Sequence, residues 1–384
     1  MELIYLDYNA TAPVHPAVRE KIRPYMEEAF GNASSLHAAG RKARVGIEEA
    51  RALILKLLND PRGELVFTSG GTEAGNLALR GVMENSRAKG NHLIISAVEH
   101  SAVLQPAQAL QREGYEVTFL PVDKLGRVDP EAVRRAITPQ TVLISIMHAN
   151  NEVGTIQPIE AIGAIAREKG VLFHTDAVQS FGKIPVDMAK LPVDMVSLSA
   201  HKLGGLKGTG ALYLRRGLKL KPQIVGGPHE HNMRAGTENV VGIVAMGEAA
   251  RISVAELNDG TIARIGTLRD RLQQELLSSI SDAVLNGDPA NRVPGTLHLS
   301  FLGCEGESLL MALDMARIAV STGSACSAGS MQPSHVLKAM DVQKDCLQGA
   351  IRLSLGWGST QAQIDEALLR IPPVIAQMRK TPKA

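Results

Sequence analysis

An acid and a lysine follow two neighbouring apolar runs of this chain. The run Val171–Gln179 includes Asp176, and about 26 residues later Ser197–Lys207 includes Lys202. If both runs are strands of one sheet, a carboxylate and an amine meet at neighbouring strand ends. Pyridoxal phosphate chemistry needs this pair, because a lysine forms the Schiff base and an acid keeps the pyridinium nitrogen protonated. Taken alone, Lys202 is better explained as a surface lysine and Asp176 as a helix-capping aspartate. The hypothesis of a pyridoxal phosphate site therefore depends on further residues.

Two turns rich in small residues are candidates for a phosphate site. Thr68–Ala74 follows a predicted strand and opens a helix, with Gly71 and Thr72 in the turn. Glycine lets the backbone approach a phosphate, and a helix N-terminus offers free N–H groups. The alternative is an ordinary helix with Thr72 as its cap. A second such turn, Arg234–Asn239, includes Thr237 and is a plausible further phosphate contact.

A histidine and several amides also stand at predicted strand ends. His100 can stack on a pyridine ring and shuttle protons there, the alternative being a structural histidine. Asn151, next to Asn150, can bind a phenolic oxygen or a substrate carboxylate, although adjacent amides are also common in turns. Gln179 lies three residues after Asp176 and can face the same way.

The segment around Lys202 offers two lysines for the Schiff base. Lys207 lies five residues later in a glycine-rich loop, whereas Lys202 is nearer the strand end and follows Ser199 and His201. A strand end fixes the backbone better than a loop does, so we favour Lys202.

The C-terminal part contributes a thiol and an arginine. Small and polar residues surround Cys326, which is typical of a displayed thiol, whereas Cys304 and Cys346 fit small core residues. Arg352 lies within an alternating strand pattern. Its planar fork suits the α-carboxylate of an amino acid, the alternative being an arginine on the exposed face of an edge strand.

Composition excludes several classes of protein. Lys+Arg 41 against Asp+Glu 39 leaves a net charge of +2, and aromatic residues make up 3%. Neither value indicates a nucleic-acid partner. No apolar run approaches the roughly 18 residues that a membrane span needs, and the N-terminus has no signal-peptide pattern. Three widely spaced cysteines fit reduced thiols. We expect a soluble cytoplasmic enzyme with no membrane contact.

Short apolar runs alternate with helical patterns between about residues 64 and 215, which predicts an α/β fold with a mostly parallel seven-stranded sheet between helices. The expected strands are Leu65–Thr68, Leu93–Ser96, Val117–Pro121, Val142–Met147, Leu172–Thr175, Met195–Ser199 and Ala211–Leu214. Two long helical stretches and a smaller α+β region follow. We expect a large domain at 16–255 and a small domain made of 1–15 and 256–384, which carries the cysteine loop.

The motifs together resemble one family along nearly the whole chain, the NifS/IscS-type cysteine desulfurases of the class-V aminotransferase group, which are fold-type I pyridoxal phosphate enzymes. Any one motif is weak evidence, but ten in the family's order are specific. They are Tyr5–Pro13, Phe30–His37, Phe67–Glu73, Glu99–His100, Ser145–Gly154, His174–Ser180, Ser199–Lys202, Arg234–Thr237, Gly323–Ser327 and Ile351–Gly356.

The resemblance implies a role for each matching residue. It implies that the phosphate contacts are Gly71, Thr72, Ser199, His201 and, from the other subunit of a homodimer, Thr237. His100 would stack on the ring, Asp176 would hold its nitrogen, and Gln179 and Asn151 would contact the phenolic oxygen or the substrate. Lys202 would carry the cofactor. The implied substrate-carboxylate ligands are Arg352, Asn9 and Asn32.

The same resemblance implies a reaction and a partner. The Lys202 amine would remove the α-proton of L-cysteine, and the Cys326 thiolate would attack the substrate sulfur. The products would be alanine and a persulfide on Cys326. An iron–sulfur scaffold protein is the expected acceptor, and thiolated tRNA or other thio-cofactor routes stay open. No resident metal site is expected, although Cys326 could ligate a cluster transiently within a scaffold complex.

The chain departs from the family's pattern in two places. Leu206 replaces a proline after the lysine, and Gly226–Asn232 holds Pro228 and His231 where the family has glycine and arginine. Other interpretations are a selenocysteine lyase, a class-V aminotransferase, or a non-catalytic partner in iron–sulfur assembly. The thiol loop disfavours the aminotransferase, and the retained Lys202 and Asp176 disfavour the non-catalytic partner.

Overall fold

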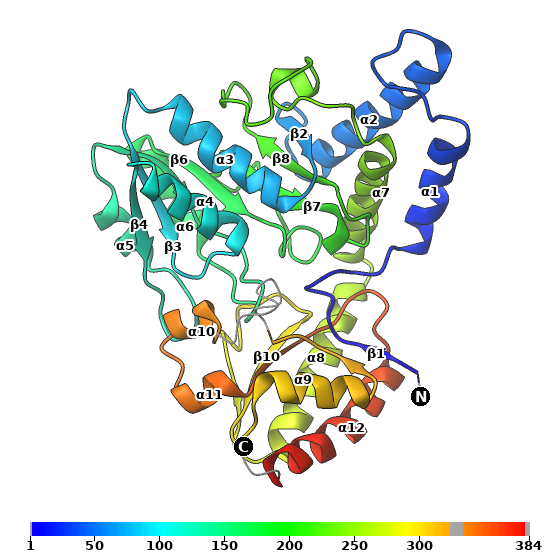
Figure 1. Cartoon of the computed structure of the whole chain (residues 1–384), viewed down its shortest axis with the longest axis vertical. Coiled ribbons are helices and arrows are strands. Elements are labelled where there is room, and N and C mark those ends of the chain that lie inside the picture. Colours follow the sequence, from blue (N-terminus) through cyan, green and yellow to red (C-terminus); the bar gives the residue numbers. More distant parts are fainter. Residues whose placement is uncertain (1, 323–332, 381–384) are drawn as a thin grey trace.

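The computed structural model describes residues 2–322 and 333–380. A seven-stranded sheet forms its larger part (Figure 1), in the strand order β2-β8-β7-β6-β5-β3-β4. β8 runs antiparallel to β2 and β7, and the other pairings are parallel. The strands are β2 (Glu64–Thr68), β3 (His92–Ser96), β4 (Glu116–Leu120), β5 (Thr141–Ser145), β6 (Leu172–Asp176), β7 (Met195–Ser199) and β8 (Gly210–Leu214). The expected fold class is confirmed.

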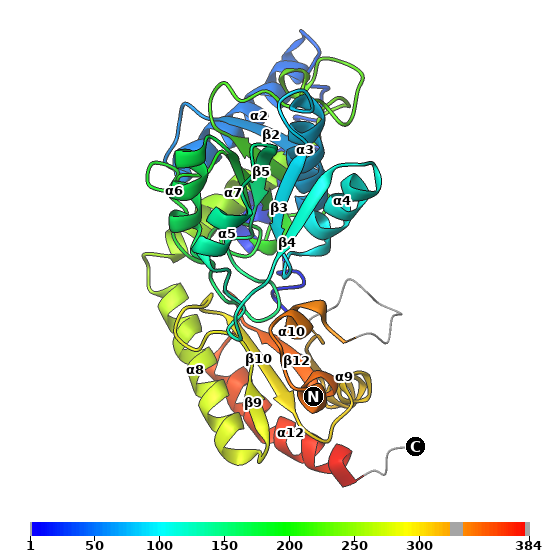
Figure 2. The ribbon, with the colours of Figure 1, turned by 90° about the vertical axis from the view of Figure 1, so that its left-hand side faces the viewer.

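Helices cover both faces of this sheet (Figure 2). Along β3, Ile94 belongs to one hydrophobic cluster and its neighbours Leu93 and Ile95 to another on the opposite face, as the two-residue period of a strand requires. Residues of α2, α6 and α7 pack in the first cluster, and residues of α3 and α4 in the second. The helices are α1 (Pro16–Glu27), α2 (Ala38–Leu57), α3 (Gly71–Asn85), α4 (Ser101–Arg112), α5 (Pro130–Ala136), α6 (Ile159–Lys169) and α7 (Val240–Glu256).

The C-terminal part has its own antiparallel sheet, in which β10 lies between β9 and β12. The short β1 and β11 pair in parallel beside it. Its elements are β1 (Ile4–Tyr5), α8 (Thr261–Ser279), β9 (Ala283–Leu285), β10 (Thr296–Phe301), α9 (Gly306–Met315), β11 (Ile318–Ala319), α10 (His335–Ala339), α11 (Lys344–Gln348), β12 (Ala350–Ser354) and α12 (Gln361–Lys380).

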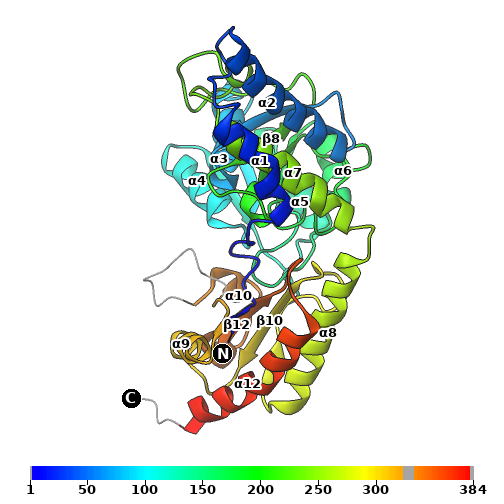
Figure 3. The ribbon, with the colours of Figure 1, turned by 90° about the vertical axis from the view of Figure 1, so that its right-hand side faces the viewer.

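The N-terminal chain connects the two parts (Figure 3). Asp7 pairs with Ser354 at the edge of β12, and farther along the chain the N–H of Ala12 donates to the carbonyl oxygen of His201 over 2.9 Å. The side chains of α7 belong to the core of the large sheet and those of α8 to a separate core. This separation supports the domain boundary near residue 255, which we retain as a proposal.

No helix in the described ranges is both long and apolar enough to cross a bilayer.

Candidate active site

The carboxyl ends of the strands bring several of the predicted residues to one edge of the large sheet. Asp176 is paired in register with Ser197 on β7, and Gly210 at the start of β8 pairs with both Ser199 and Thr68. The turn after Thr68 and the turn after Ser199 therefore lie side by side. Ligands of parallel sheets bind at such an edge.

Lys202 ends η1 (Ala200–Lys202), the short 3-10 turn that directly follows β7. Its Nζ donates to the main-chain oxygen of Asn9 over 2.5 Å and to that of Ala10 over 2.8 Å. Lys207 is exposed. Of the two lysines weighed from the sequence, Lys202 is the one that the fold holds at the sheet edge.

Asp176 is a buried carboxylate that accepts the N–H of Val178 over 2.9 Å. Burial raises its pKa to about 6, against the lowering effect of the Lys202 charge. Within residues 2–322 and 333–380 no Lys, Arg or His nitrogen lies within 4.0 Å of it. A buried carboxylate without an adjacent cation is suited to a ligand that carries a protonated ring nitrogen.

His100 caps α4, because its Nδ1 accepts the N–H of Ala102 over 3.1 Å. Burial first, and then the charges of Lys202, His335 and Arg352, lower its pKa to about 4. The ring is therefore neutral at pH 7. Since Nδ1 is an acceptor, the ring proton resides on Nε2.

Glu99, next to His100, is fully buried and holds two strand ends together. Its Oε1 accepts the hydroxyl of Ser96 over 2.6 Å and the N–H of Met147 over 2.9 Å. Burial raises the pKa of this carboxyl to about 8, so it is largely protonated at neutral pH.

The N-terminus of α3 is the candidate phosphate site. The helix begins at Gly71 after Gly70, with no side chain capping it, so the alternative with Thr72 as the cap is wrong. A Cβ at Gly71 would lie 2.9 Å from Cγ2 of Val178, which leaves glycine as the residue that fits. Free N–H groups and close backbone access suit a phosphate.

His201 lies near this turn, and its Nδ1 is 3.1 Å from Oγ1 of Thr11. Burial lowers its pKa to about 4, and Lys202 is the next cause. Neutral His201 can therefore offer a single ring N–H to an anion.

Two of the implied residues lie apart from the others within one chain. Asn32 belongs to the exposed α1–α2 connection, where its Oδ1 accepts the N–H of Ser34, and Figure 3 places this connection at the top of the molecule, far from β12 in the lower part. Thr237 is exposed on the chain that leads into α7. A single chain does not bring either to Lys202.

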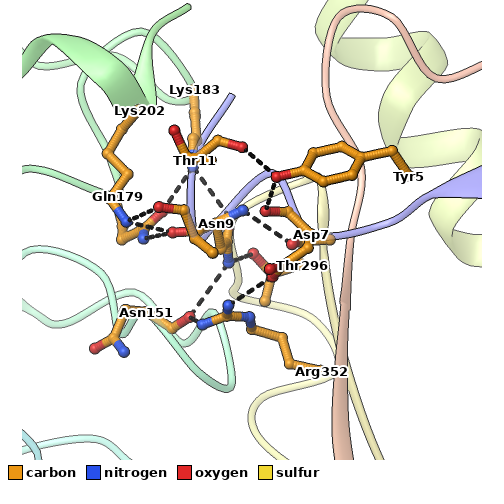
Figure 4. Close-up of polar contacts among 12 residues, drawn as sticks. Tyr5, Asp7, Asn9, Thr11, Asn151, Gln179, Lys183, Lys202, Thr296 and Arg352 are labelled. Atoms are coloured by element: carbon orange, nitrogen blue, oxygen red, sulfur yellow. Dashed lines mark hydrogen bonds and ion pairs between the residues drawn. The ribbon is translucent and has the colours of Figure 1, made fainter. Parts of the chain in front are cut away.

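Asn9 is the centre of a polar network (Figure 4). Its main-chain oxygen accepts Lys202 Nζ and also Nε2 of Gln179, over 2.9 Å. Its Nδ2 donates to Oγ1 of Thr296 over 2.9 Å, and its Oδ1 accepts Nζ of Lys183 over 3.1 Å. Asn9, Gln179 and Lys202 are thus brought together as the sequence analysis expects.

Arg352 lies on β12, is 2% exposed, and faces the same network. Its Nη2 donates to Oδ1 of Asp7 over 2.9 Å and its Nη1 to the main-chain oxygen of Asn151 over 3.0 Å. Nε of Arg352 and Oδ1 of Asn151 are buried and have no hydrogen-bond partner among the described residues. These atoms are open for a carboxylate and an N–H donor, respectively.

Cys326 lies outside the described residues. Cys304 and Cys346 are buried, and burial raises the pKa of both thiols. The expectation that these two are core residues is confirmed. In the part of the chain that the structure describes, no three His, Cys, Asp or Glu side chains form a metal-binding group.

The departure at Gly226–Asn232 has a definite conformation. Glu230, His231 and Asn232 have successive φ values of 44°, 55° and 66°, a left-handed run that is costly for residues other than glycine. The carboxylate of Glu230 accepts both terminal nitrogens of Arg51 over 2.8 and 2.9 Å. This buried ion pair stabilises the turn. At the other departure from the family's pattern, Leu206 packs against the hydrophobic core of the large sheet.

The sequence analysis missed Lys183 and gave Asp7 no separate role. Lys183 follows Gln179 by four residues, a spacing that places both on one side of a helical turn, and this was the available signal. The partner of Asp7 is 345 residues away in the chain, so no local pattern reveals it.

The residues present fit pyridoxal phosphate. An amine, a buried carboxylate without an adjacent cation, a neutral histidine and an uncapped helix N-terminus meet at one sheet edge. These are the groups that the cofactor's aldehyde, ring nitrogen, ring face and phosphate require.

Known proteins share this architecture and sequence. The family model described as Aminotransferase class-V matches residues 4–367. The chain is 48% identical over 376 residues to "Cysteine desulfurase IscS" of Dictyoglomus turgidum, covering 98% of this chain and 95% of that one. It is 46% identical over 384 residues to the protein of the same name from Methanosarcina thermophila, covering 99% and 95%. A solved "NIFS-LIKE PROTEIN" matches with TM-score 0.92 and 38% identity over 98% of this chain and 100% of that one.

Proposed function

The chain belongs to the class-V aminotransferase family and is a pyridoxal phosphate-dependent cysteine desulfurase, and from this premise we propose which residues remove sulfur from L-cysteine. One observation supports the assignment most: the Lys202 amine and the Asp176 carboxylate meet at neighbouring strand ends, beside the uncapped N-terminus of α3. A surface lysine and a capping aspartate would not converge there.

The cofactor is held by residues of the large sheet's edge. The N–H groups of Gly71 and Thr72, with Ser199 and His201, bind its phosphate, and Asp176 holds its ring nitrogen. His100 stacks on the ring, and Gln179 and Asn151 direct N–H groups to its phenolic oxygen or to the substrate. When bound, the cofactor supplies an electron sink that makes the α-proton of the substrate acidic.

Protons then move between named atoms of this chain. Nζ of Lys202 takes the α-proton and returns it, and the Nε2–H group of neutral His100 donates a hydrogen bond to the reacting substrate. Arg352 binds the substrate carboxylate beside Asn9, and the partner subunit's exposed α1–α2 connection contributes Asn32.

Cys326 accepts the sulfur. Its thiolate forms an S–S bond to the sulfur of L-cysteine as the carbon–sulfur bond of the substrate breaks. The electron pair of that bond stays on carbon, which is protonated to become the methyl group of alanine. The products are alanine and a persulfide on Cys326, and the step needs Cys326 in its thiolate form.

Mass spectrometry of peptides from protein incubated with L-cysteine tests this acceptor. The Cys326 peptide should gain one sulfur that a thiol reductant removes. Extra sulfur on the peptides of Cys304 or Cys346, with none on Cys326, would overturn the assignment.

The active form is a homodimer. Large apolar side chains are exposed on adjoining segments of the large part: Phe30 is 75% exposed, Leu36 90% and Val225 83%. The 3.0 Å ion pair of Arg44 with Glu238 ties α2 to the chain that carries Thr237. A second subunit covers these side chains and receives Thr237 in its phosphate site. Leu36→Glu should therefore yield a monomer in analytical ultracentrifugation.

The acceptor of the sulfur is an iron–sulfur scaffold protein, and the compartment is the cytoplasm. The buried, unpaired thiols Cys304 and Cys346 support a reducing compartment. Transfer of labelled sulfur from Cys326 to purified scaffold protein would test the partner.

A further inference from the structure

Lys183 is a second lysine in the site whose charge has no carboxylate partner. It follows β6, and its Nζ donates to Oε1 of Gln179 over 2.7 Å and to Oδ1 of Asn9 over 3.1 Å. Within the described ranges no carboxylate oxygen lies within 4.0 Å of this nitrogen. Both of its acceptors are neutral amide oxygens that belong to the proposed site, and this is an unusual environment for a lysine amine.

An ammonium group accepts no hydrogen bond, so its neighbours must turn oxygen atoms toward it. Oε1 of Gln179 therefore faces Lys183, and Nε2 is left to point the other way. Nε2 donates to the main-chain oxygen of Asn9, which is the atom that also accepts Nζ of Lys202. The amide N–H group of Gln179 is thus held beside the lysine that carries the cofactor.

The amide of Asn9 is fixed in the same way. Its Oδ1 faces Lys183, and its Nδ2 donates to Oγ1 of Thr296 on β10 over 2.9 Å. One ammonium group therefore sets the orientation of two amides, those of Gln179 and Asn9.

We propose that Lys183 is a positioning residue, which in its ammonium form holds the Gln179 amide with its N–H group toward Lys202 and adds a positive charge at that point. This inference rests on the proposed function, in which Gln179 serves the cofactor's phenolic oxygen. A directed N–H donor stabilises negative charge on that oxygen. A nearby cation disfavours a proton on the nitrogen that joins Lys202 to the cofactor. Both effects lower the pH at which that nitrogen loses its proton.

Charged and titratable groups face Lys183 from several elements. Lys202 and Arg352 lower its pKa, after burial, to about 7, and the charge of Lys183 in turn lowers the pKa of His201. Glu256 of α7 lines the same cavity as Lys183 and Lys202. All of these groups remain in a Lys183 variant, so a difference in its titration midpoint from the wild type is due to the loss of Lys183.

The test is a pH titration of the visible absorption band of the cofactor-loaded enzyme. Lys183→Met removes the charge and the donor but keeps the length of the side chain. The midpoint should rise by about one pH unit, whereas it should not move in the matched control Lys207→Met. A midpoint equal to that of the wild type in Lys183→Met would overturn the proposal, even if the variant unfolds at a lower temperature.

Gln179→Glu gives a second, independent reading. The carboxylate keeps an acceptor for Lys183 and loses the N–H group, so the midpoint should again rise. If Lys183→Met does not fold, an unmoved midpoint in Gln179→Glu overturns the proposal. A wild-type protein without the visible band would instead refute the proposed function, so the two failures are distinguishable.

Discussion

Nη2 of Arg352 lies 2.9 Å from Oδ1 of Asp7, and this ion pair joins β12 to the chain that follows β1. The main-chain oxygen of Asn151 holds Nη1 of the same guanidinium. The arginine is therefore fixed by its own chain, and its Nε, which has no partner within residues 2–322 and 333–380, is left for a ligand. A site prepared in this way loses little entropy when it binds a carboxylate.

Arg352→Lys keeps the charge but loses the planar fork. We expect KM for L-cysteine to rise roughly 10- to 100-fold, because a charged hydrogen bond contributes about 1.5–3 kcal/mol. Steady-state alanine release measures KM, and an unchanged visible cofactor band serves as the control. A KM equal to that of the wild type would show that the carboxylate binds elsewhere.

Lys202→Ala should lose the covalent link to the cofactor, whereas Lys207→Ala should keep it. Lys202 is held at the end of β7, and Lys207 is exposed on the following loop. Borohydride reduction followed by peptide mapping locates the linked lysine. Reduced cofactor on Lys207 would refute the assignment.

Asp176 should make the stability of the cofactor-free protein depend on pH. Its folded-state pKa is about 6, against 3.8 for an aspartate exposed to water, so only the folded chain retains the proton between these values. Stability is therefore full below about pH 4 and falls as the pH rises toward 6, with a loss of about 2–3 kcal/mol at neutral pH.

Asparagine has no charge to bury, and its Oδ1 can still accept the N–H of Val178. Asp176→Asn without cofactor should therefore resist urea better than the wild type at pH 7, and equally well near pH 4. The Asp176 charge is one of the causes that raise the pKa of Glu99, so its removal eases the burial of Glu99 and changes stability at pH 7 in the same direction. A less stable variant at pH 7 would contradict the raised pKa of Asp176.

Cys304→Ser and Cys346→Ser should leave sulfur transfer largely intact. Both thiols are buried, with pKa values raised by burial, and each substitution buries a hydroxyl in place of a thiol. We expect a loss of about 1–3 kcal/mol in the free energy of unfolding, measured in urea. Near-complete loss of alanine release in either variant would reveal a relay through that thiol.

The elements of the large sheet were predictable from the sequence, because each strand is an apolar run between turns. Met195–Ser199 is observed as expected, and β6 extends one residue beyond its expected end to include Asp176. Parallel strands end at one edge, so Asp176 and Lys202 could be brought together from local pattern alone.

Long-range contacts of the N-terminal chain were not predictable in this way. The β1–β11 pair, the Asp7–Arg352 ion pair and the contact of Lys183 with Asn9 join segments more than 170 residues apart. No periodicity in the sequence encodes them, since they depend on how the two parts of the chain pack. In the proposed homodimer Asn32 and Thr237 serve the site of the second subunit, whose position the pattern of a single chain does not encode.

The most direct test of the central claim is alanine release from L-cysteine, with a thiol reductant present, by the wild type and Cys326→Ala side by side. The account predicts release by the wild type and none by the variant, because Cys326 accepts the sulfur. Equal release by both would contradict it, since the cofactor chemistry would then proceed without the thiol.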